Sequence, residues 1–144
     1  MMADVSSTTS AVVRCLSGRR EIQAAYVFGS VATGRARPDS DVDVAVLVDQ
    51  RVKPAQMLKY RLKLMADLGS ALRRSDVDVV VLNEAPPLLA HRVLSQGRLV
   101  FERSAPARVR FQVKTGARYF DLIPMFETHI RYLKKNVRKG RVVG

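Results

Sequence analysis

The sequence predicts an α/β protein in which a small mixed sheet is flanked by helices. Four short apolar segments rich in β-branched residues alternate with segments whose apolar residues recur at helical spacing. Such alternation is typical of a sheet that is covered by helices. The chain has 144 residues, of which 47% are hydrophobic, so its size and composition fit one globular domain.

The N-terminal part of the chain predicts a helix, a strand and then a loop. A short helix over about residues 8 to 17 ends at Gly18, and IQAAYVF at 22–28 has the composition of a strand. The strand stops at a Gly-Ser pair, after which VATG at 31–34 predicts a short helical turn. RARPDS at 35–40 has the composition of an exposed loop.

A second strand and a long amphipathic helix follow this loop. The strand begins within SDVDVAVLV at 40–48, and Pro54 suits the first turn of the helix after it. Apolar residues recur near three- and four-residue spacing through this helix, at 57–72, with basic residues between them. The apolar residues that we expect to face the sheet are Leu58, Leu62, Met65 and Leu72.

Two further strands enclose a third helix. SDVDVVVL at 75–82 repeats the Ser-Asp-Val-Asp opening of the earlier strand. A Pro-Pro pair then opens a helix that runs to Gln96, and GRLVFE at 97–102 predicts a last short strand. We therefore expect a core domain at 1–103 and a basic C-terminal helical extension at 104–144.

The C-terminal extension is both basic and apolar. Residues 103–144 carry 11 basic and 2 acidic side chains, whereas residues 1–102 carry 14 and 11, and the whole chain has a net charge of +12. Gly116 and Pro124 interrupt its helical pattern over 105–139, which predicts two helices or one kinked helix. Its many apolar residues predict packing on the core and on a partner. The positive charge fits an acidic protein, nucleic acid, anionic lipid or only solvent.

Cysteine content and the N-terminus predict a cytoplasmic protein. The single cysteine, Cys15, cannot form an internal disulfide and lies among apolar residues of the first helix. The N-terminus lacks the charged and apolar regions of a signal peptide, and no segment has the ~20 apolar residues needed to cross a bilayer. We therefore expect no association with a membrane.

The first Ser-Asp-Val-Asp motif places two carboxylates at the start of a buried strand. Residues i and i+2 of a strand project from one face, so Asp41 and Asp43 share a face and the valines between and after them share the other. Two carboxylates so placed repel each other unless a cation lies between them. Hard divalent ions, above all Mg²⁺, meet this need. The alternative is turn chemistry with solvated side chains.

A Gly-Ser pair at the end of the preceding strand has the features of a phosphate site. Gly29 permits close approach of the backbone, and Ser30 opens a helical turn with unpaired N–H groups and a hydroxyl. Ser40, Arg35 and Arg37 lie in the following loop and are candidates for phosphate contacts or for solvated side chains. Because one element would hold phosphate and the other its metal, the two together predict a nucleoside triphosphate with Mg²⁺.

The stretch FGSVATGRARPDSDVDVAVLV resembles the signature of the DNA polymerase β-type nucleotidyltransferases, in which Gly-Ser precedes Asp-x-Asp. With ten residues between Ser30 and Asp41, it is similar to the minimal nucleotidyltransferases of the MntA type, which act as antitoxins beside HEPN-domain ribonuclease toxins. VDVVVLNEAPPLLAHRVLSQGRLVFE resembles the third-carboxylate strand of that group and the helix after it. The resemblance covers about residues 20 to 135 and implies a polymerase β-like palm as the core.

This resemblance implies a role for each residue that matches the motif. Gly29 and Ser30 would hold the triphosphate of ATP, and Asp41 and Asp43 would coordinate two Mg²⁺ ions. Asp78 would be the third carboxylate, which binds the catalytic metal and helps to remove the proton of the attacking hydroxyl. The products would be a nucleotidylated acceptor and pyrophosphate.

The second Ser-Asp-Val-Asp differs from the first because no phosphate loop precedes it. In the family pattern a single carboxylate suffices on this strand. We therefore expect Asp76 to be a solvated residue at the end of the strand, facing Arg73 or Arg74.

The resemblance implies an Mg²⁺-dependent antitoxin that transfers AMP from ATP to a tyrosine of a cognate HEPN toxin and so silences it. Two alternatives stay open. One is a standalone enzyme that modifies a small molecule such as an aminoglycoside, although little chain follows the last strand to build an acceptor pocket. The other is a basic nucleic-acid-binding module with a vestigial site, although an intact set of Asp41, Asp43 and Asp78 argues against lost activity.

Overall fold

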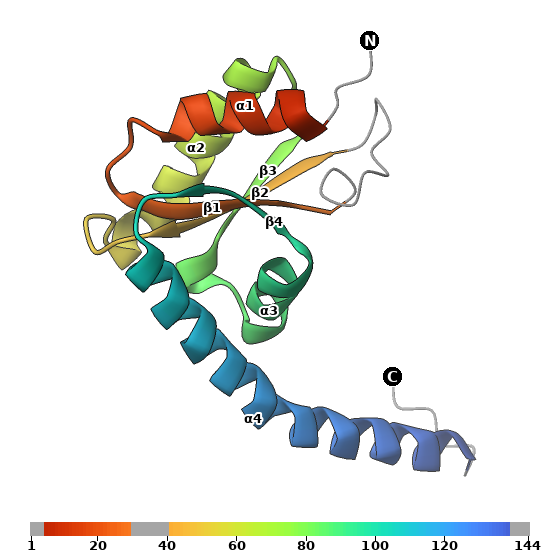
Figure 1. Cartoon of the computed structure of the whole chain (residues 1–144). Helices are drawn as coiled ribbons and strands as arrows, with labels where there is room; N and C mark the ends of the chain where they lie inside the picture. Colours follow the sequence, from red (N-terminus) through yellow and green to blue (C-terminus); the bar gives the residue numbers. More distant parts are fainter. Residues whose placement is uncertain (1–4, 30–40, 139–144) are drawn as a thin grey trace.

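The computed structural model describes residues 5–29 and 41–138, and it has the predicted α/β architecture with a long C-terminal helix (Figure 1). The elements in chain order are α1 (Val5–Leu16), β1 (Ile22–Phe28), β2 (Val42–Val48), the 3-10 helix η1 (Pro54–Gln56), α2 (Met57–Leu72), β3 (Val77–Val81), the 3-10 helix η2 (Leu82–Glu84), α3 (Pro87–Gln96), β4 (Arg98–Glu102) and α4 (Ala105–Arg138).

The sheet is mixed, as the sequence predicts, and its strand order is β3-β2-β1-β4. β1 pairs in antiparallel fashion with β2 and β4, whereas β2 and β3 run parallel. A parallel pair requires a crossover connection, and α2 provides it between β2 and β3. β1 and β2 therefore form the buried centre of the sheet, and β3 is an edge strand.

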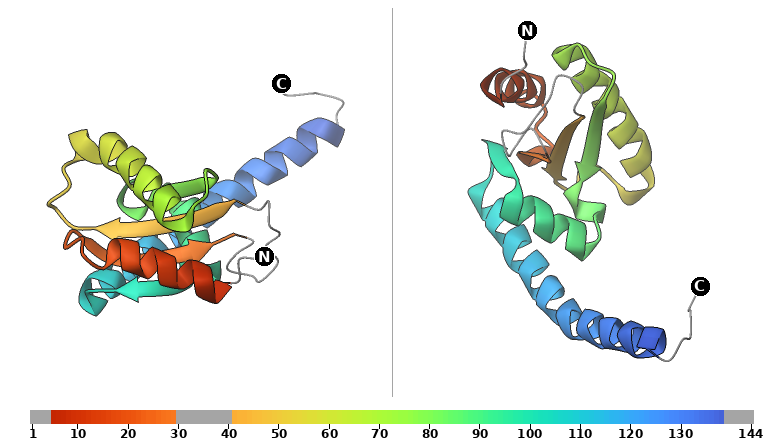
Figure 2. Two further views of the ribbon diagram at one scale, coloured as in Figure 1. Left: turned by 90° about the horizontal axis from the view of Figure 1, so that it is seen from above. Right: turned by 90° about the vertical axis from the view of Figure 1, so that its right-hand side faces the viewer.

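Helices cover both faces of the sheet, so the core has two parts (Figure 2). On one face, Val44 and the other even-numbered valines of β2 pack with α1 and with Leu64 of α2. On the other face, Leu47 packs in a second cluster with Val93 of α3 and Phe111 of α4. This division follows from the alternation of side chains along a strand.

The face of α2 that packs on the sheet is not the face that the sequence predicts. The buried residues of this helix are Met57, Leu64 and Leu68. The side chains of Leu58 and Leu62 are 66% and 54% exposed, so their assignment to the core is wrong. Successive residues of an α-helix are separated by about 100° around its axis. Leu58 and Leu62 therefore point about 100° or more away from the direction of Met57. Met65 and Leu72 lie between these directions and are partly buried against the core.

α4 is one continuous helix of 34 residues, and it is curved rather than straight (Figure 1). Pro124 lies inside it, and the hydroxyl of Thr128 donates to the Pro124 carbonyl at 2.9 Å. Of the two predicted forms, the single helix is therefore the one observed. Neither α4 nor another described helix has a segment long and apolar enough to cross a membrane.

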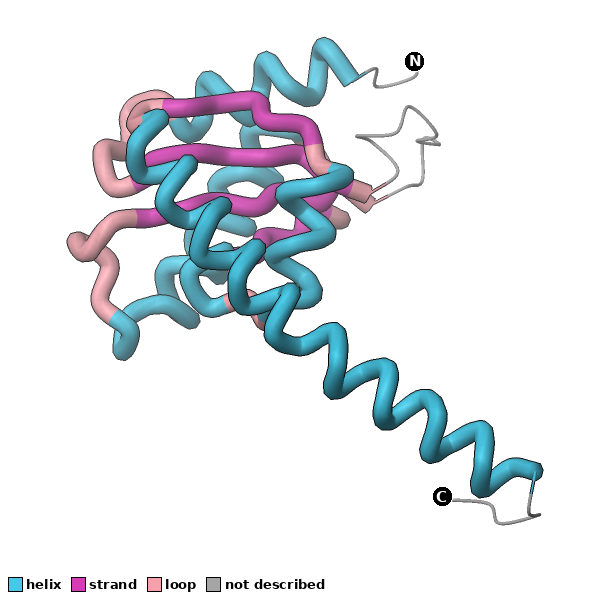
Figure 3. The backbone as a smooth tube through the Cα atoms, turned by 60° about the horizontal axis from the view of Figure 1, so that its bottom comes forward, coloured by secondary structure: helices cyan, strands magenta, loops and turns pink. Residues whose placement is uncertain are grey.

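The two halves of α4 have different surroundings. In the first half, Phe111 joins the core, Thr115 is 4% exposed, and the Tyr119 ring stacks on His91 of α3 with ring centroids 3.7 Å apart. The second half, residues 124–138, extends beyond the sheet (Figure 3). Its exposed large apolar residues are Met125, Phe126, Ile130, Tyr132 and Leu133.

Candidate active site

The structure brings the three predicted carboxylates to one end of the sheet. β2 and β3 are parallel and in register, so Asp43 lies directly opposite Asp78. Neighbouring strands lie about 4.8 Å apart, which places these two side chains on adjacent strands of one sheet face. Asp41 comes just before β2 and has an exposed side chain.

Asp43 lies in surroundings that disfavour its negative charge. Its side chain is half-buried, and the loss of solvation raises its pKa above the ordinary value. Repulsion from Asp78 and then from Asp41 raises the pKa further. Each of these causes disfavours the charged form. The arrangement around Asp43 is therefore short of positive charge.

Gly29 lies against the carboxylate of Asp43. Phe28 pairs with Asp43 across β1 and β2, and Gly29 follows with a positive φ of 76°. A Cβ built at this position would lie 2.6 Å from Oδ2 of Asp43. Glycine suits this position, because the backbone conformation is strained for an L-residue and an added Cβ would force the Asp43 carboxylate to shift.

Asp78 is held by a residue that sequence reasoning missed, Arg61 of α2. The Arg61 guanidinium forms an ion pair with Oδ1 of Asp78 at 3.2 Å, and its Nε donates to the Val79 carbonyl at 2.6 Å. The backbone N–H of Val79 donates to the same Oδ1 at 2.9 Å.

The sequence does contain a signal for Arg61. Positions 57, 61, 64 and 68 form one stripe along the helix, at spacings of four, three and four residues. Three of these positions carry buried apolar side chains, and the fourth carries an arginine. A charged residue within a core-facing stripe indicates a specific partner, since burial of an unpaired charge is costly.

Asp76 forms an ion pair with Arg74, one of the two arginines that the sequence predicts it to face. Its carboxylate pairs with the guanidinium of Arg74 through two hydrogen bonds of 2.6 and 2.7 Å. This interaction lowers the pKa of Asp76 below the ordinary value. The second Ser-Asp-Val-Asp therefore supplies one carboxylate to the cluster, Asp78, and one to a local ion pair.

Four other candidates, Ser30, Arg35, Arg37 and Ser40, lie outside the described residues, as does the short helical turn expected at 31–34. Their contacts with phosphate stay predictions.

The donor chemistry of this end of the sheet fits Mg²⁺, although the side chains are not gathered around an ion. Within 5–29 and 41–138, no group of three or more His, Cys, Asp or Glu side chains is placed to hold a metal ion. The candidate ligands are all carboxylates, the hard oxygen donors that Mg²⁺ prefers. The raised pKa of Asp43, caused by burial and then by repulsion from Asp78 and Asp41, shows that its charged form is disfavoured where no cation lies beside it.

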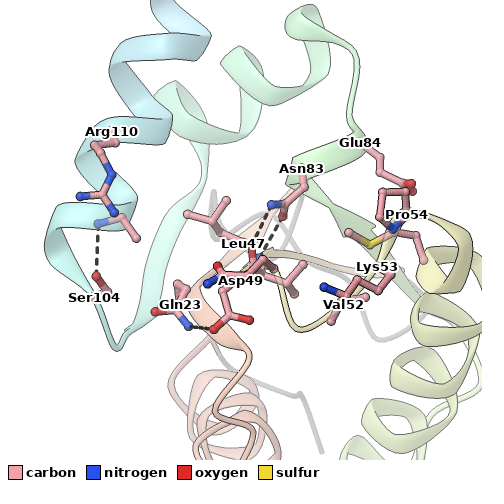
Figure 4. A pocket seen from close by; sticks show the side chains of 14 residues that line it. Gln23, Leu47, Asp49, Val52, Lys53, Pro54, Asn83, Glu84, Ser104 and Arg110 are labelled. Carbon is pink, nitrogen blue, oxygen red and sulfur yellow. Dashed lines mark hydrogen bonds between the residues drawn. The ribbon is translucent and has the colours of Figure 1, made fainter.

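A separate cavity of about 840 Å³ lies at the opposite end of the strands (Figure 4). It is lined by residues from the start of β1, the end of β2 and the start of α4, among them Gln23, Asp49 and Arg110. On one wall, the side-chain amide of Asn83 exchanges two hydrogen bonds with the backbone of Val48, at 2.8 and 2.9 Å. Of the predicted site residues, those that the structure describes, Gly29, Asp41, Asp43 and Asp78, do not line this cavity.

A glycine ends one strand, an Asp-x-Asp opens the next, and a third aspartate lies in register on a parallel neighbour. This is the arrangement that the resemblance to nucleotidyltransferases implies. Residues 11–106 match the family model described as "Polymerase beta, Nucleotidyltransferase". The chain belongs to this family.

Two curated relatives are protein adenylyltransferases named MntA. The chain is 34% identical over 99 residues to MntA of Shewanella oneidensis, covering 69% of this chain and 67% of the relative. It is 33% identical over 98 residues to MntA of Aphanizomenon flos-aquae, covering 60% of this chain and 61% of the relative. The resemblance to MntA-type proteins is thereby confirmed.

Solved structures extend the similarity over most of the chain. A crystal structure of a toxin-antitoxin with AMP-PNP has a TM-score of 0.73 and 28% identity, covering 88% of this chain and 98% of that one. A tri-AMPylated Shewanella oneidensis HEPN toxin in complex with MNT antitoxin gives a TM-score of 0.69 and 26% identity, with 90% and 98% coverage.

Proposed function

We propose that this chain is an Mg²⁺-dependent adenylyltransferase antitoxin, which transfers AMP from ATP to a tyrosine hydroxyl of a HEPN ribonuclease toxin. The observation that carries the proposal is that Asp43 and Asp78 are paired on adjacent strands and that Gly29 lies against the Asp43 carboxylate. The similarity to protein adenylyltransferases and to toxin-antitoxin complexes supports the choice of substrate and partner.

The proposed reaction is an in-line displacement at the α-phosphorus of ATP. The acceptor oxygen forms a new bond to this phosphorus, and the bond from phosphorus to the pyrophosphate oxygen breaks. Asp78 is placed on the exposed edge strand, with half of its side chain accessible, and takes the proton of the acceptor hydroxyl. The products are the adenylylated tyrosine and pyrophosphate.

The carboxylates of Asp41, Asp43 and Asp78 would hold the metal. Mg²⁺, when bound, would neutralise phosphate charge and stabilise the attacking and leaving oxygens. The protein's own contribution is to hold Asp43 and Asp78 on adjacent strands despite their repulsion, and to keep the space beside Asp43 free of any side chain at residue 29.

The second half of α4 is the proposed contact surface for the toxin. It carries the exposed apolar residues from Met125 to Leu133, which no described part of the chain covers. Arg131, Lys134 and Lys135 lie on the same segment, where Glu127 is the one acidic residue after Pro124. An apolar surface with a basic rim fits an acidic partner.

Intact-mass measurement tests the proposal. The chain is purified with its HEPN partner and incubated with ATP and Mg²⁺, with Asp43→Asn as the inactive control. An AMP increment on the partner in the wild-type reaction alone is the expected result. Transfer only to small-molecule acceptors would support the aminoglycoside-type alternative. Absence of any transfer, together with steeply salt-dependent binding of nucleic acid, would support the nucleic-acid module.

A further inference from the structure

Arg61 reaches the carboxylate cluster from the opposite face of the sheet. α2 packs on the face formed by the even-numbered valines of β2, whereas Asp43 alternates with those valines and projects from the other face. Because β3 is an edge strand, the Arg61 side chain can pass around it to Asp78. This contact therefore connects a helix on one face with a carboxylate on the other.

The contacts of Asp78 divide its two oxygens into separate roles. Oδ1 accepts hydrogen bonds from Arg61 at 3.2 Å and from the backbone N–H of Val79 at 2.9 Å. No described residue donates to Oδ2. Among the three carboxylates of the cluster, Asp78 is also the one that forms an ion pair within the described part of the chain.

We propose that Arg61 is a positioning residue of the transferase site, which holds Asp78 through Oδ1 and leaves Oδ2 for the metal and the acceptor proton. Nε fixes the guanidinium to the Val79 carbonyl, so the terminal nitrogen is directed at the carboxylate. The positive charge also offsets the repulsion between Asp78 and Asp43, which are paired across β2 and β3. This inference rests on the proposed function.

An arginine suits this role better than a lysine. Its planar guanidinium donates to two acceptors in a fixed geometry, whereas an ammonium is a single flexible point charge. Arg61→Lys therefore keeps the charge and loses the two-point attachment, and Arg61→Gln loses both. Lys63→Gln, two residues along α2, removes an equal charge from an exposed side chain and is the matched control.

The experiment uses the full chain with its HEPN partner and has two readouts. Steady-state AMP transfer gives kcat and the KM for ATP. Binding of Mn²⁺ in the presence of a non-hydrolysable ATP analogue, followed by electron paramagnetic resonance, requires no turnover. Asp78→Asn is the reference for loss of a ligand, and thermal melting checks that each variant is folded.

Arg61→Gln should lower kcat by about 10- to 100-fold, the usual range for residues that orient a ligand, with the KM for ATP little changed. Arg61→Lys should fall between Arg61→Gln and the wild type. Mn²⁺ should bind Arg61→Gln more weakly than the wild type, because the Asp78 ligand is kept but is no longer held in place. Asp78→Asn should bind Mn²⁺ more weakly.

Three outcomes would overturn the inference. They are a kcat for Arg61→Gln equal to that of Lys63→Gln, an Mn²⁺ affinity of Arg61→Gln equal to that of Lys63→Gln, and a kcat for Arg61→Lys no higher than that of Arg61→Gln. If Arg61→Gln does not fold, Arg61→Lys decides, and a wild-type kcat in that variant overturns the inference. A wild-type chain that transfers nothing contradicts the proposed function instead, and Mn²⁺ binding alone then tests Arg61.

Discussion

Asp43 and Asp78 occupy directly paired positions on two parallel strands, although they lie 35 residues apart in the sequence. The crossover helix α2 returns the chain to the same end of the sheet, so the two strands run parallel. The two Ser-Asp-Val-Asp segments of the sequence lead into these two paired strands. Pairing of like charges across strands is destabilising, so it indicates a functional requirement at this position.

Replacing Asp43 by Asn should stabilise the metal-free protein while it abolishes transfer. Burial and repulsion raise the pKa of Asp43 above 3.8, so the folded state binds more protons than the unfolded state, and the charged form costs stability as pH rises through the raised pKa. The melting temperature of Asp43→Asn in EDTA should therefore exceed that of the wild type at pH 7. Transfer should fall by about 100-fold or more, beyond the usual cost of removing an orienting residue.

Asp49→Asn is the control for this prediction, since Asp49 follows the other end of β2. Its carboxylate accepts hydrogen bonds from Gln23 at 3.1 Å and from Arg51 at 3.0 Å. Asp49→Asn weakens these hydrogen bonds, so this substitution should lower the melting temperature of the protein. A lower melting temperature for Asp43→Asn as well would contradict the proposed electrostatic strain.

Asp78→Asn and Asp76→Asn should have opposite profiles. Asp78→Asn should lower kcat by about 10²- to 10⁴-fold, the range for loss of a general base, with nucleotide binding nearly unchanged. Asp76→Asn should keep transfer and cost at most about 1 kcal/mol of stability, as for an ion pair near the surface. Kinetics and denaturant unfolding of both variants, measured side by side, check these values.

The contribution of Asp76 to stability should also depend on pH. Its pKa is lowered by the hydrogen bond with Arg74, so the stabilisation is present above pH 3.8 and is lost as pH falls through the lowered pKa. The difference in stability between wild type and Asp76→Asn should therefore shrink in acid. Equal losses of transfer in the two variants would mean that Asp76 and Asp78 form a paired site.

Gly29→Ala should reduce both stability and transfer. The positive φ costs an L-residue about 1 to 2 kcal/mol. The added Cβ would also lie 2.6 Å from Oδ2 of Asp43 and would displace this carboxylate. Gly116→Ala in α4 is the matched control, because nothing lies within 4 Å of the added Cβ. It should gain up to about 1 kcal/mol from helix propensity, with unchanged transfer. Equal behaviour of the two variants, by thermal melting and transfer rate, would contradict the close packing at Gly29.

Local patterns predicted most of the secondary structure. The strand at 22–28 and the helix at 57–72 have the predicted bounds, because glycines, prolines and apolar periodicity act over a few residues. The Asp-x-Asp alternation also predicted which valines enter the core, since strand geometry fixes it.

Features that depend on contacts between distant segments were harder to predict. Which side of α2 is buried depends on where the sheet lies, so Leu58 and Leu62 were misplaced. The role of Arg61 depends on β3 being an edge strand, a property of the whole topology. The continuity of α4 through Pro124 was also not fixed by local pattern, because an internal proline is compatible with both a break and a kink.

Removal of the second half of α4 should abolish binding of the toxin without unfolding the core. Truncation after Ile123 keeps Phe111, Thr115 and Tyr119, whose packing on the sheet and on α3 would be lost in a shorter chain. It removes the exposed apolar residues and the basic residues around them. Calorimetric titration with the HEPN partner and circular dichroism of the truncated chain measure binding and folding.

Point substitutions test whether binding of the toxin needs the exposed apolar surface of α4 and not only the length of this helix. Ile130→Asp places a charge on the proposed contact surface, where the wild-type side chain is 50% exposed, and should weaken binding by about tenfold or more. Leu58→Asp changes a similarly exposed residue of α2, at 66%, and should leave binding unchanged. Binding should also weaken as salt is raised, because the basic residues attract an acidic partner over about a Debye length. Full affinity in the truncated chain, or equal effects of the two substitutions, would place the toxin contact elsewhere on the protein.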